Sequence, residues 1–181
     1  IMKLNKAKLI EMFFKTMVRF FGAKGFSKMY LASSQSETYA KFCEQVYGRN
    51  LCQFNMLDDE QLQTLLRELN LYSRHNVLDI GCGIGKISEY ISDTTGAKIL
   101  GVDFANGAIQ AASARTKEKQ ERIKFVTGNF NDLTAVVHEK YDAIILLDTL
   151  YFANDRQKCI ETLRSFLNPN GVVAIFYSSS N

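Results

Sequence analysis

The feature of this sequence that most constrains its fold is the segment NVLDIGCGIGKIS at residues 76–88. A short apolar run stops at a loop that has glycine at alternate positions, namely Gly81, Gly83 and Gly85. After the loop, apolar residues recur at the spacing of a helix. A strand, glycine turn and helix in this order let a ligand approach the main chain and point free N–H groups at it. The segment therefore predicts a binding loop for a nucleotide-like ligand.

The spacing of this loop excludes two common phosphate-binding motifs. A dinucleotide fingerprint would need glycine where Lys86 stands, and a P-loop would need glycine and a hydroxyl residue where Ile80 and Ile87 stand. The strand ends instead with a carboxylate, Asp79, which repels phosphate and attracts a cationic group. A second carboxylate, Asp103, ends the next apolar run, where it can accept both hydroxyls of an unphosphorylated ribose. These positions favour a nucleoside-like ligand without a phosphate group at the loop.

Composition limits the broad class of the protein. At 181 residues and 46% hydrophobic content, the chain suits one globular domain with a sizeable core. A net charge of +3 does not indicate a nucleic-acid footprint over the whole molecule. The four cysteines form no C-x-x-C pair and lie far from both histidines in the sequence, which argues against a zinc site and favours a reducing, cytoplasmic environment. Transmembrane helices need about 20 apolar residues, and no stretch of that length occurs.

Strand and helix patterns alternate along the chain. We expect strands at 77–80, 98–102, 123–126, 141–147 and 172–177. We expect helices at 37–47, from Asp58, from the glycine loop to about residue 93, at 106–117 and from Asp155. Residues 168–171, with the sequence NPNG, are predicted to form a turn that starts the last strand. This alternation is typical of a parallel, doubly wound sheet.

Polar side chains follow four of the predicted strands at or just beyond their carboxyl ends: Asp79, Asp103, Asn129 and Asp148. Any one of them alone is well explained as a helix cap or a turn former. Because ligands of doubly wound sheets bind beyond the carboxyl ends of the strands, four such residues in register predict a shared site.

Five segments of the sequence resemble motifs of the class I S-adenosylmethionine-dependent methyltransferases. VLDIGCGIG is similar to the first motif of that family, and GVDFANGAIQAA at 101–112 is similar to the acidic second motif. The likeness continues through VTGNFNDL at 126–133, YDAIILLDTLYF at 141–152 and LRSFLNPNGVVAIF at 163–176, so it covers roughly residues 55 to 177. The resemblance implies a Rossmann-like sheet in residues 56–181 that binds S-adenosyl-L-methionine, preceded by a helical cap or lid in residues 1–55.

The resemblance also implies roles for individual residues. The glycine loop passes the methionine part of the cofactor with Asp79 near its ammonium group, Asp103 holds the ribose hydroxyls, and Phe104 packs on the adenine. Asn129 takes the place of an acidic residue that commonly bonds the adenine amino group in the family. The complete implied set is Asp79, Gly81, Cys82, Gly83, Gly85, Asp103, Phe104, Asn129, Phe130 and Leu147.

The function predicted from these residues is methyl transfer to a small-molecule acceptor. The family's nucleic-acid and protein amide modifiers carry a motif like N-P-P-Y where this chain has Asp148 to Tyr151, and no nucleic-acid module accompanies it. Asp148 and Tyr151 are candidates for a catalytic base, and no metal is required. By analogy, candidates for the pocket wall are Tyr30, Tyr39, Tyr47, Phe54 and Asn55. Two alternatives stay open: a module that binds the cofactor or its product without turnover, and a nicotinamide dehydrogenase, which Lys86 disfavours.

The first 30 residues form a basic, amphipathic segment. They contain seven lysines and arginines against Glu11 alone. Apolar residues recur there at helical spacing: Leu9, Ile10, Phe13, Phe14, Met17, Val18, Phe20 and Phe21. This apolar stripe either packs on the domain and closes over the ligand, or docks on anionic lipid or a partner. Three residues, Gly22, Gly25 and Ser27, are predicted to break the helix.

The sequence stops four residues after the predicted fifth strand. The sheet of the resembled family normally continues with a helix and an antiparallel strand pair. We therefore expect the chain to be a fragment or shortened form, with part of the acceptor pocket outside it. An uncovered fifth strand is a pairing edge, which predicts a homodimer or aggregation through that edge.

Overall fold

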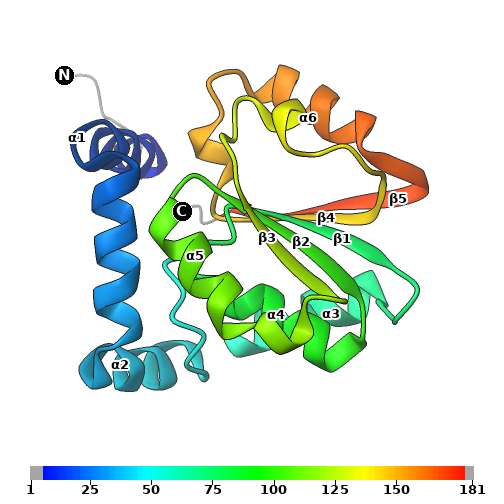
Figure 1. Ribbon diagram of the computed structural model, residues 1–181. Helices are drawn as coiled ribbons and strands as arrows, with labels where there is room; N and C mark the ends of the chain where they lie inside the picture. Colours follow the sequence, from blue (N-terminus) through cyan, green and yellow to red (C-terminus); the bar gives the residue numbers. More distant parts are fainter. Residues whose placement is uncertain (1–5, 178–181) are drawn as a thin grey trace.

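Five parallel strands form the centre of the molecule in the order β3-β2-β1-β4-β5 (Figure 1). The computed structural model describes residues 6–177, and before Phe20 it describes the side chains of Met12 and Thr16 alone. The strands are β1 (Asn76–Ile80), β2 (Lys98–Asp103), β3 (Ile123–Thr127), β4 (Tyr141–Leu147) and β5 (Leu167–Phe176). The predicted α/β fold with a doubly wound parallel sheet is confirmed.

Helices cover both faces of this sheet. They are α1 (Lys6–Ser34), α2 (Glu37–Tyr47), α3 (Asp59–Leu69), α4 (Lys86–Thr95), α5 (Asn106–Arg115) and α6 (Arg156–Ser165), with the short 3-10 helices η1 (Lys117–Lys119), η2 (Leu133–Ala135) and η3 (Leu150–Phe152). Figure 1 shows α3, α4 and α5 below the sheet and α6 above it. Side chains of successive strand residues point to opposite faces of the sheet, so Val77 packs with α3 and α4 while its neighbour Leu78 packs with α6.

Local sequence signals explain where several helices begin. The capping box predicted at Asp58 is present, because Gln61 N–H donates to Asp58 Oδ1 at 2.8 Å and Asp58 N–H donates to Gln61 Oε1 at 3.0 Å. The Asp155 side chain accepts from Lys158 N–H at 3.0 Å at the start of α6. These caps fix the helix starts within a residue or two of the predicted positions.

The first helix is interrupted only at one of the three predicted positions. Gly22 has φ 52° and ψ −170°, which kinks α1, whereas Gly25 and Ser27 lie in the helix after the kink. The Ser27 hydroxyl donates to Ala23 O at 2.8 Å, so this serine is satisfied inside the helix. The prediction that Gly25 and Ser27 also break the helix is wrong. Of the predicted apolar stripe, Phe20 and Phe21 are exposed, and the other side chains lie outside the described residues.

The last strand begins earlier than expected. Leu167 already pairs with Tyr141, and regular pairing resumes only between Val172 and Ala143, so residues 168–171 form a bulge within β5. Asn170 adopts φ 67° in this bulge, and the Asn168 side chain donates to Asp142 Oδ1 at 2.8 Å. The NPNG segment is thus a bulge in the strand rather than a turn before it, because its two ends both pair with β4.

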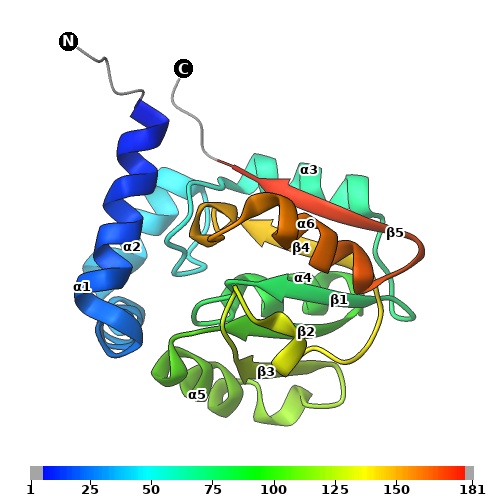
Figure 2. The ribbon, with the colours of Figure 1, turned by 90° about the horizontal axis from the view of Figure 1, so that it is seen from above.

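The order of the strands places a ligand site beside β1. The chain runs outward from β1 through β2 to β3 and then crosses to β4, so the carboxyl ends of β1 and β4 flank the switch point. The strands point toward α1, which packs beside α5 and η3 at this edge (Figure 2). Helix α1 therefore covers the edge where the predicted site residues lie.

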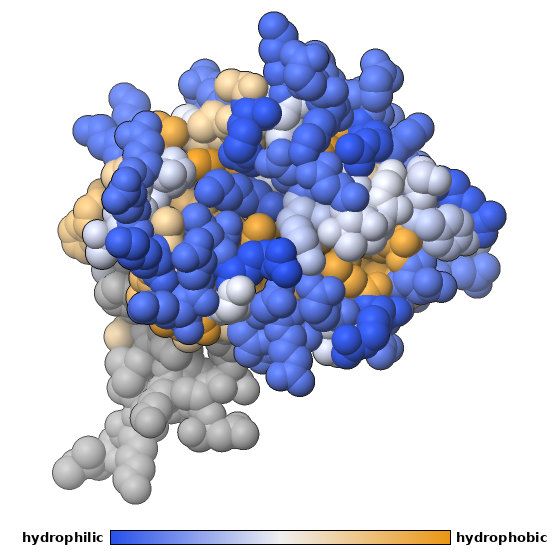
Figure 3. Space-filling view, turned by 90° about the horizontal axis from the view of Figure 1, so that it is seen from below, coloured by the Kyte–Doolittle hydropathy of each residue, from blue (hydrophilic) through white to orange (hydrophobic). Residues whose placement is uncertain are grey.

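The surface made by α3, α4 and α5 is mostly hydrophilic, with small separate apolar areas (Figure 3). None of the helices within residues 6–177 combines the length and apolarity that crossing a membrane requires.

Candidate functional site

Two adjoining cavities open at the carboxyl edge of the sheet. The first, here the β4 cavity, is bordered by the glycine loop, residues 51–55 and residues 147–152. The second, here the β2 cavity, is bordered by the ends of β2 and β3 with the residues that follow them. Five residues line both cavities: Phe26, Tyr30, Gly81, Thr149 and Phe152. Together the cavities form one elongated site across the ends of β4, β1, β2 and β3.

The glycine loop needs glycine for two different reasons. Gly81, Gly83 and Gly85 have φ of 81°, 55° and 73°, values that other residues rarely adopt. A Cβ on Gly81 would lie 2.2 Å from the Thr149 methyl carbon, so the close approach of β4 also requires glycine there. Gly85 borders neither cavity, and a Cβ on it would lie 2.4 Å from the Phe125 ring. Gly85 therefore serves the packing of α4 on the sheet, while Gly81 and Gly83 shape the cavities.

Asp103 lies at the end of β2 and lines the β2 cavity. Its Oδ2 accepts from Gly83 N–H at 2.9 Å and its Oδ1 accepts from Ala105 N–H at 2.8 Å. Burial raises the pKa of this carboxyl, while the N–H groups of Ala105, Gly83 and Phe104 act against the rise. An ionised carboxylate has about four acceptor positions, so with these three N–H groups Asp103 can still accept a hydrogen bond from a ligand.

Asp79 lies at the end of β1 and lines the β4 cavity. Its Oδ2 accepts from the Ser88 hydroxyl at 2.5 Å, whereas Oδ1 accepts no hydrogen bond from the side chains and N–H groups of the described residues. Burial raises the pKa of Asp79 to about 6, the Ser88 hydrogen bond opposes the rise, and the charge of Asp103 adds to it. A buried carboxylate with an unoccupied oxygen favours a cationic ligand, which would lower this pKa again.

The end of β4 ties three segments of the site together. Asp148 adopts φ 54°, and its Oδ2 accepts from Met56 N–H at 2.9 Å, which fixes residues 51–57 beside the cavity. The Thr149 hydroxyl donates to Ile80 O at 3.0 Å. Burial, with the charge of Asp148 as the next cause, raises the pKa of Tyr151. A raised pKa keeps the proton on the Tyr151 phenol at neutral pH.

Helix α1 contributes aromatic side chains to both cavities. The Tyr30 ring lies against the glycine loop, since a Cβ on Gly83 would be 2.9 Å from its Cε1. Phe26 packs on Phe104 with ring centroids 5.2 Å apart. Burial, followed by the charge of Asp103, raises the pKa of the Tyr30 phenol well above its usual value. Tyr30 is therefore a neutral phenol between the two cavities.

The predicted adenine side is the β2 cavity. Phe104, Asn129 and Phe130 all line it. The Asn129 side-chain oxygen already accepts from Asn131 N–H at 2.9 Å, so it has one acceptor position left for a ligand.

Most of the predicted residues come together at this edge, with some differences. Asp79, Cys82, Gly83 and Leu147 line the β4 cavity with the predicted wall residues Tyr30, Phe54 and Asn55 and the candidate bases Asp148 and Tyr151. Tyr39 and Tyr47 pack behind this wall instead. The Tyr39 ring stacks on Phe54 at 5.3 Å, and its hydroxyl donates to Gln53 O at 2.7 Å.

Sequence reasoning missed some residues that line the cavities: Phe26, Cys52, Gln53 and Lys86. Phe26 lies four residues before Tyr30, which places the two on one helix face, and this spacing is the signal that points to it. Lys86 directly follows Gly85 as the first residue of α4, so its place at the end of the glycine loop is the signal for it. Cys52 and Gln53 carry no motif, because the fold of the loop before α3 brings them in.

The fold and the site together define a nucleoside-binding α/β domain. It has a switch point at β1, a glycine loop without a phosphate motif and carboxylates at the ends of β1 and β2. Comparisons with known proteins identify the family within this class.

A family profile described as a methyltransferase domain matches residues 71–181. A ubiquinone biosynthesis O-methyltransferase of Histophilus somni is 30% identical over 131 residues, which are 70% of this chain and 54% of that protein. The methyltransferase GfsG of Streptomyces halstedii is 25% identical over 65% of this chain and 42% of its own length. A crystal structure of a methyltransferase from Geobacter sulfurreducens with S-adenosyl-L-homocysteine has a TM-score of 0.59 and 25% identity, over 68% of this chain and 49% of that one.

The chain therefore belongs to the class I S-adenosylmethionine-dependent methyltransferases, through its methyltransferase domain. It spans about half the length of the curated relatives it matches. The family, the fold and the cofactor class predicted from the glycine loop are confirmed.

Proposed function

We propose that this chain binds S-adenosylmethionine and transfers its methyl group to a small-molecule acceptor. The observation that carries the proposal is the pair of buried carboxylates, Asp79 and Asp103, on either side of a glycine loop at the switch point. Asp79 offers a free oxygen beside the β4 cavity, and Asp103 offers acceptor positions to the β2 cavity. Their spacing across β1 and β2 suits a ligand with a cationic end and a ribose.

The residues divide between the two halves of such a ligand. In the β2 cavity, Asp103 accepts the ribose hydroxyls, Phe104 packs on the adenine, and Asn129 accepts from its amino group. In the β4 cavity, Asp79 accepts from the ammonium group, and Gly81 and Gly83 leave room beside the main chain. When bound, S-adenosylmethionine supplies an electrophilic methyl group on a sulfonium.

The chain's own contribution to transfer is mainly positioning. Leu147, Tyr30 and Tyr151 line the β4 cavity, where they can hold the acceptor against the methyl group. Asp148 is the acidic group placed to take a proton from a hydroxyl acceptor, because its carboxylate borders the same cavity. A small acceptor is favoured over a nucleic acid, and the names of relatives such as ubiquinone biosynthesis O-methyltransferase support it.

The N-terminal segment, residues 1–55, is proposed to cover the ligand as a cap. The Ser27 hydroxyl accepts from Gly107 N–H at 3.0 Å at the start of α5, and Phe26 is buried against that helix. These contacts support a cap that is packed on the domain from residue 23 onward. A cytoplasmic location is proposed too, because all four cysteines are free thiols.

Turnover separates an enzyme from a module that only binds. We expect methyl-labelled S-adenosylmethionine to pass its label to members of a metabolite panel grouped by phenol, carboxylate, amine and thiol acceptors. The label should appear on one group and vanish with the Asp103→Ala variant. Tight binding of the cofactor without transfer to any group would favour the non-catalytic alternative.

The edge of β5 is proposed to pair with a second copy of the chain. Within residues 6–177 no strand pairs with its outer side, and Val172 and Ile175 are 46% and 41% exposed. We expect light scattering at high concentration to give a dimer mass, and Ile175→Lys to give a monomer. A monodisperse monomer of the unchanged chain would refute this pairing.

A further inference from the structure

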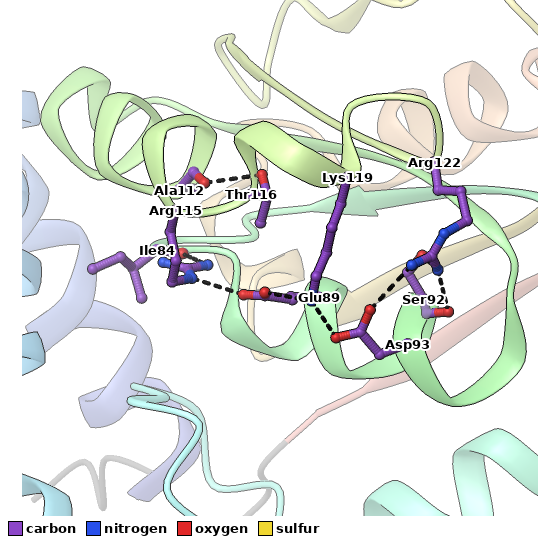
Figure 4. Close-up of polar contacts among 9 residues, drawn as sticks. All are labelled: Ile84, Glu89, Ser92, Asp93, Ala112, Arg115, Thr116, Lys119 and Arg122. Carbon is purple, nitrogen blue, oxygen red and sulfur yellow. Dashed lines mark hydrogen bonds and ion pairs between the residues drawn. The ribbon is translucent and has the colours of Figure 1, made fainter.

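A network of charged side chains joins α4 to the end of α5 and to the segment that follows it (Figure 4). Glu89 Oε2 accepts from Arg115 Nε at 2.7 Å, and Glu89 Oε1 accepts from Lys119 Nζ at 2.8 Å. Lys119 also donates to Asp93 at 2.5 Å, and Arg122 donates to the same carboxylate at 3.3 Å. The network of charged side chains thus runs the length of α4, from its first turn to its last.

Arg115 differs from the other residues of this charged network because it also contacts the glycine loop. Its Nη2 donates to Ile84 O at 2.8 Å, while its Nε is held by Glu89 (Figure 4). Burial acts to raise the pKa of Glu89, but hydrogen bonds from Lys119 and Arg115 outweigh it and lower the pKa. Glu89 therefore stays ionised and holds the guanidinium in a fixed plane.

The glycine loop is consequently held from two sides. Asp103 accepts from Gly83 N–H on the side of the cavities, and Arg115 donates to the carbonyl group of the next residue, Ile84. Arg115 lines neither cavity, so it does not touch a ligand there. The start of the loop is also held by backbone hydrogen bonds to Val102 O, and Gly85 N–H donates to Cys82 O at 2.9 Å. Because glycine loses the most freedom on ordering, a loop with three positive φ angles still needs side-chain contacts to keep this shape.

We propose that Arg115 is a positioning residue for cofactor binding: through Ile84 O it holds the glycine loop in the shape that Asp79 and Asp103 require. This role rests on the proposed function, because the ligand of the loop is taken to be S-adenosylmethionine. Glu89 acts through Arg115 by fixing the plane of the guanidinium. This role of Arg115 differs from holding α4 against the segment after α5, because Lys119 and Arg122 also hold α4 there.

Arg122 provides a matched control within the same network of charged side chains. It also donates to a backbone carbonyl of α4, Ser92 O at 2.8 Å, and it also pairs with a carboxylate, Asp93. The Arg115 and Arg122 side chains are 29% and 37% exposed, so the two substitutions are made at similarly exposed positions. Arg122 contacts the other end of α4, away from the glycine loop.

The test compares Arg115→Gln with Arg122→Gln in two measurements on the full chain. Calorimetric titration should show a roughly tenfold weaker Kd for S-adenosylmethionine in Arg115→Gln and a change below about twofold in Arg122→Gln. Hydrogen exchange of the free protein should be faster across residues 81–85 in Arg115→Gln alone. Equal effects of both variants, or no effect of Arg115→Gln on either measurement, would overturn the proposal.

A second variant keeps the test decisive if Arg115→Gln does not fold. Arg115→Lys keeps the charge beside Glu89 but cannot donate in a fixed fork to two acceptors, so we expect a Kd at least about threefold weaker. A Kd within twofold of the unchanged chain would overturn the role of the guanidinium. If the unchanged chain binds no S-adenosylmethionine, the proposed function fails, whereas hydrogen exchange of the free loop still decides the role of Arg115.

Discussion

Replacing Asp103 by alanine is expected to weaken the Kd for S-adenosylmethionine by at least about a hundredfold, because each hydrogen bond to an ionised carboxylate contributes about 1.5 to 3 kcal/mol. The variant loses the acceptor for the ribose hydroxyls. It also frees Gly83 N–H, which Asp103 Oδ2 holds at 2.9 Å, so the glycine loop loses one of its restraints. Calorimetric titration of the variant and the unchanged chain measures the effect.

Asp142→Ala is the matched control for this prediction. Asp142 lies near the amino end of β4, and its Oδ2 accepts from Asn76 N–H at 2.8 Å, so it also links a carboxylate to the backbone of a neighbouring strand. Its removal should lower thermal stability and leave the Kd within about twofold, because it lies at the opposite edge of the sheet from the site. Equal loss of affinity in both variants would mean that Asp103 acts only through the fold.

Replacing Asp79 by asparagine is expected to stabilise the free protein at pH 7.5 and to abolish measurable cofactor binding. Burial raises the pKa of Asp79 from its usual 3.8 to about 6. The folded state therefore binds the proton more tightly than the unfolded state, and this contribution to stability is lost as pH rises from about 4 through 6. At pH 7.5 the ionised carboxylate lowers the free energy of unfolding by about 2 to 3 kcal/mol, which the neutral amide avoids.

Urea unfolding at pH 7.5 and at pH 4 measures this effect, and the advantage of Asp79→Asn should shrink toward zero at the lower pH. Asp142→Asn is expected to change the free energy of unfolding at pH 7.5 in the opposite direction. Burial acts to raise the pKa of Asp142, but hydrogen bonds from Asn76 and Asn168 outweigh it and lower the pKa. Its ionised form therefore stabilises the fold at pH 7.5, and the amide should be less stable there. An Asp79→Asn variant that is less stable than the unchanged chain at pH 7.5 would contradict the assigned pKa.

The parts of the fold that the sequence predicts well have local causes. The apolar run before the glycine loop, the capping box at Asp58 and the apolar run of β4 each signal their element within a few residues. The positions of the two carboxylates at the candidate site can also be predicted from the sequence, because the carboxyl ends of parallel strands all lie at one edge of the sheet. Asp79 and Asp103 could be placed in this way before any contact was known.

The parts that could not be predicted depend on contacts between distant residues. The bulge in β5 arises because Leu167 and Val172 both pair with β4, a choice that the NPNG sequence does not reveal. Phe26 enters the cavities because α1 packs beside α5, and no motif marks that packing. The hydrogen bond from Arg115 to Ile84 O spans 31 residues, so this contact became visible only in the structure.

The central claim, that the glycine loop with Asp79 and Asp103 binds S-adenosylmethionine, is tested most directly by calorimetric titration of the purified chain. The ligands are S-adenosylmethionine, S-adenosylhomocysteine and NAD. We predict that one molecule of either adenosyl compound binds per chain and that NAD does not bind. A folded chain that binds neither adenosyl compound, or one that binds NAD tightly, would contradict this assignment of the loop.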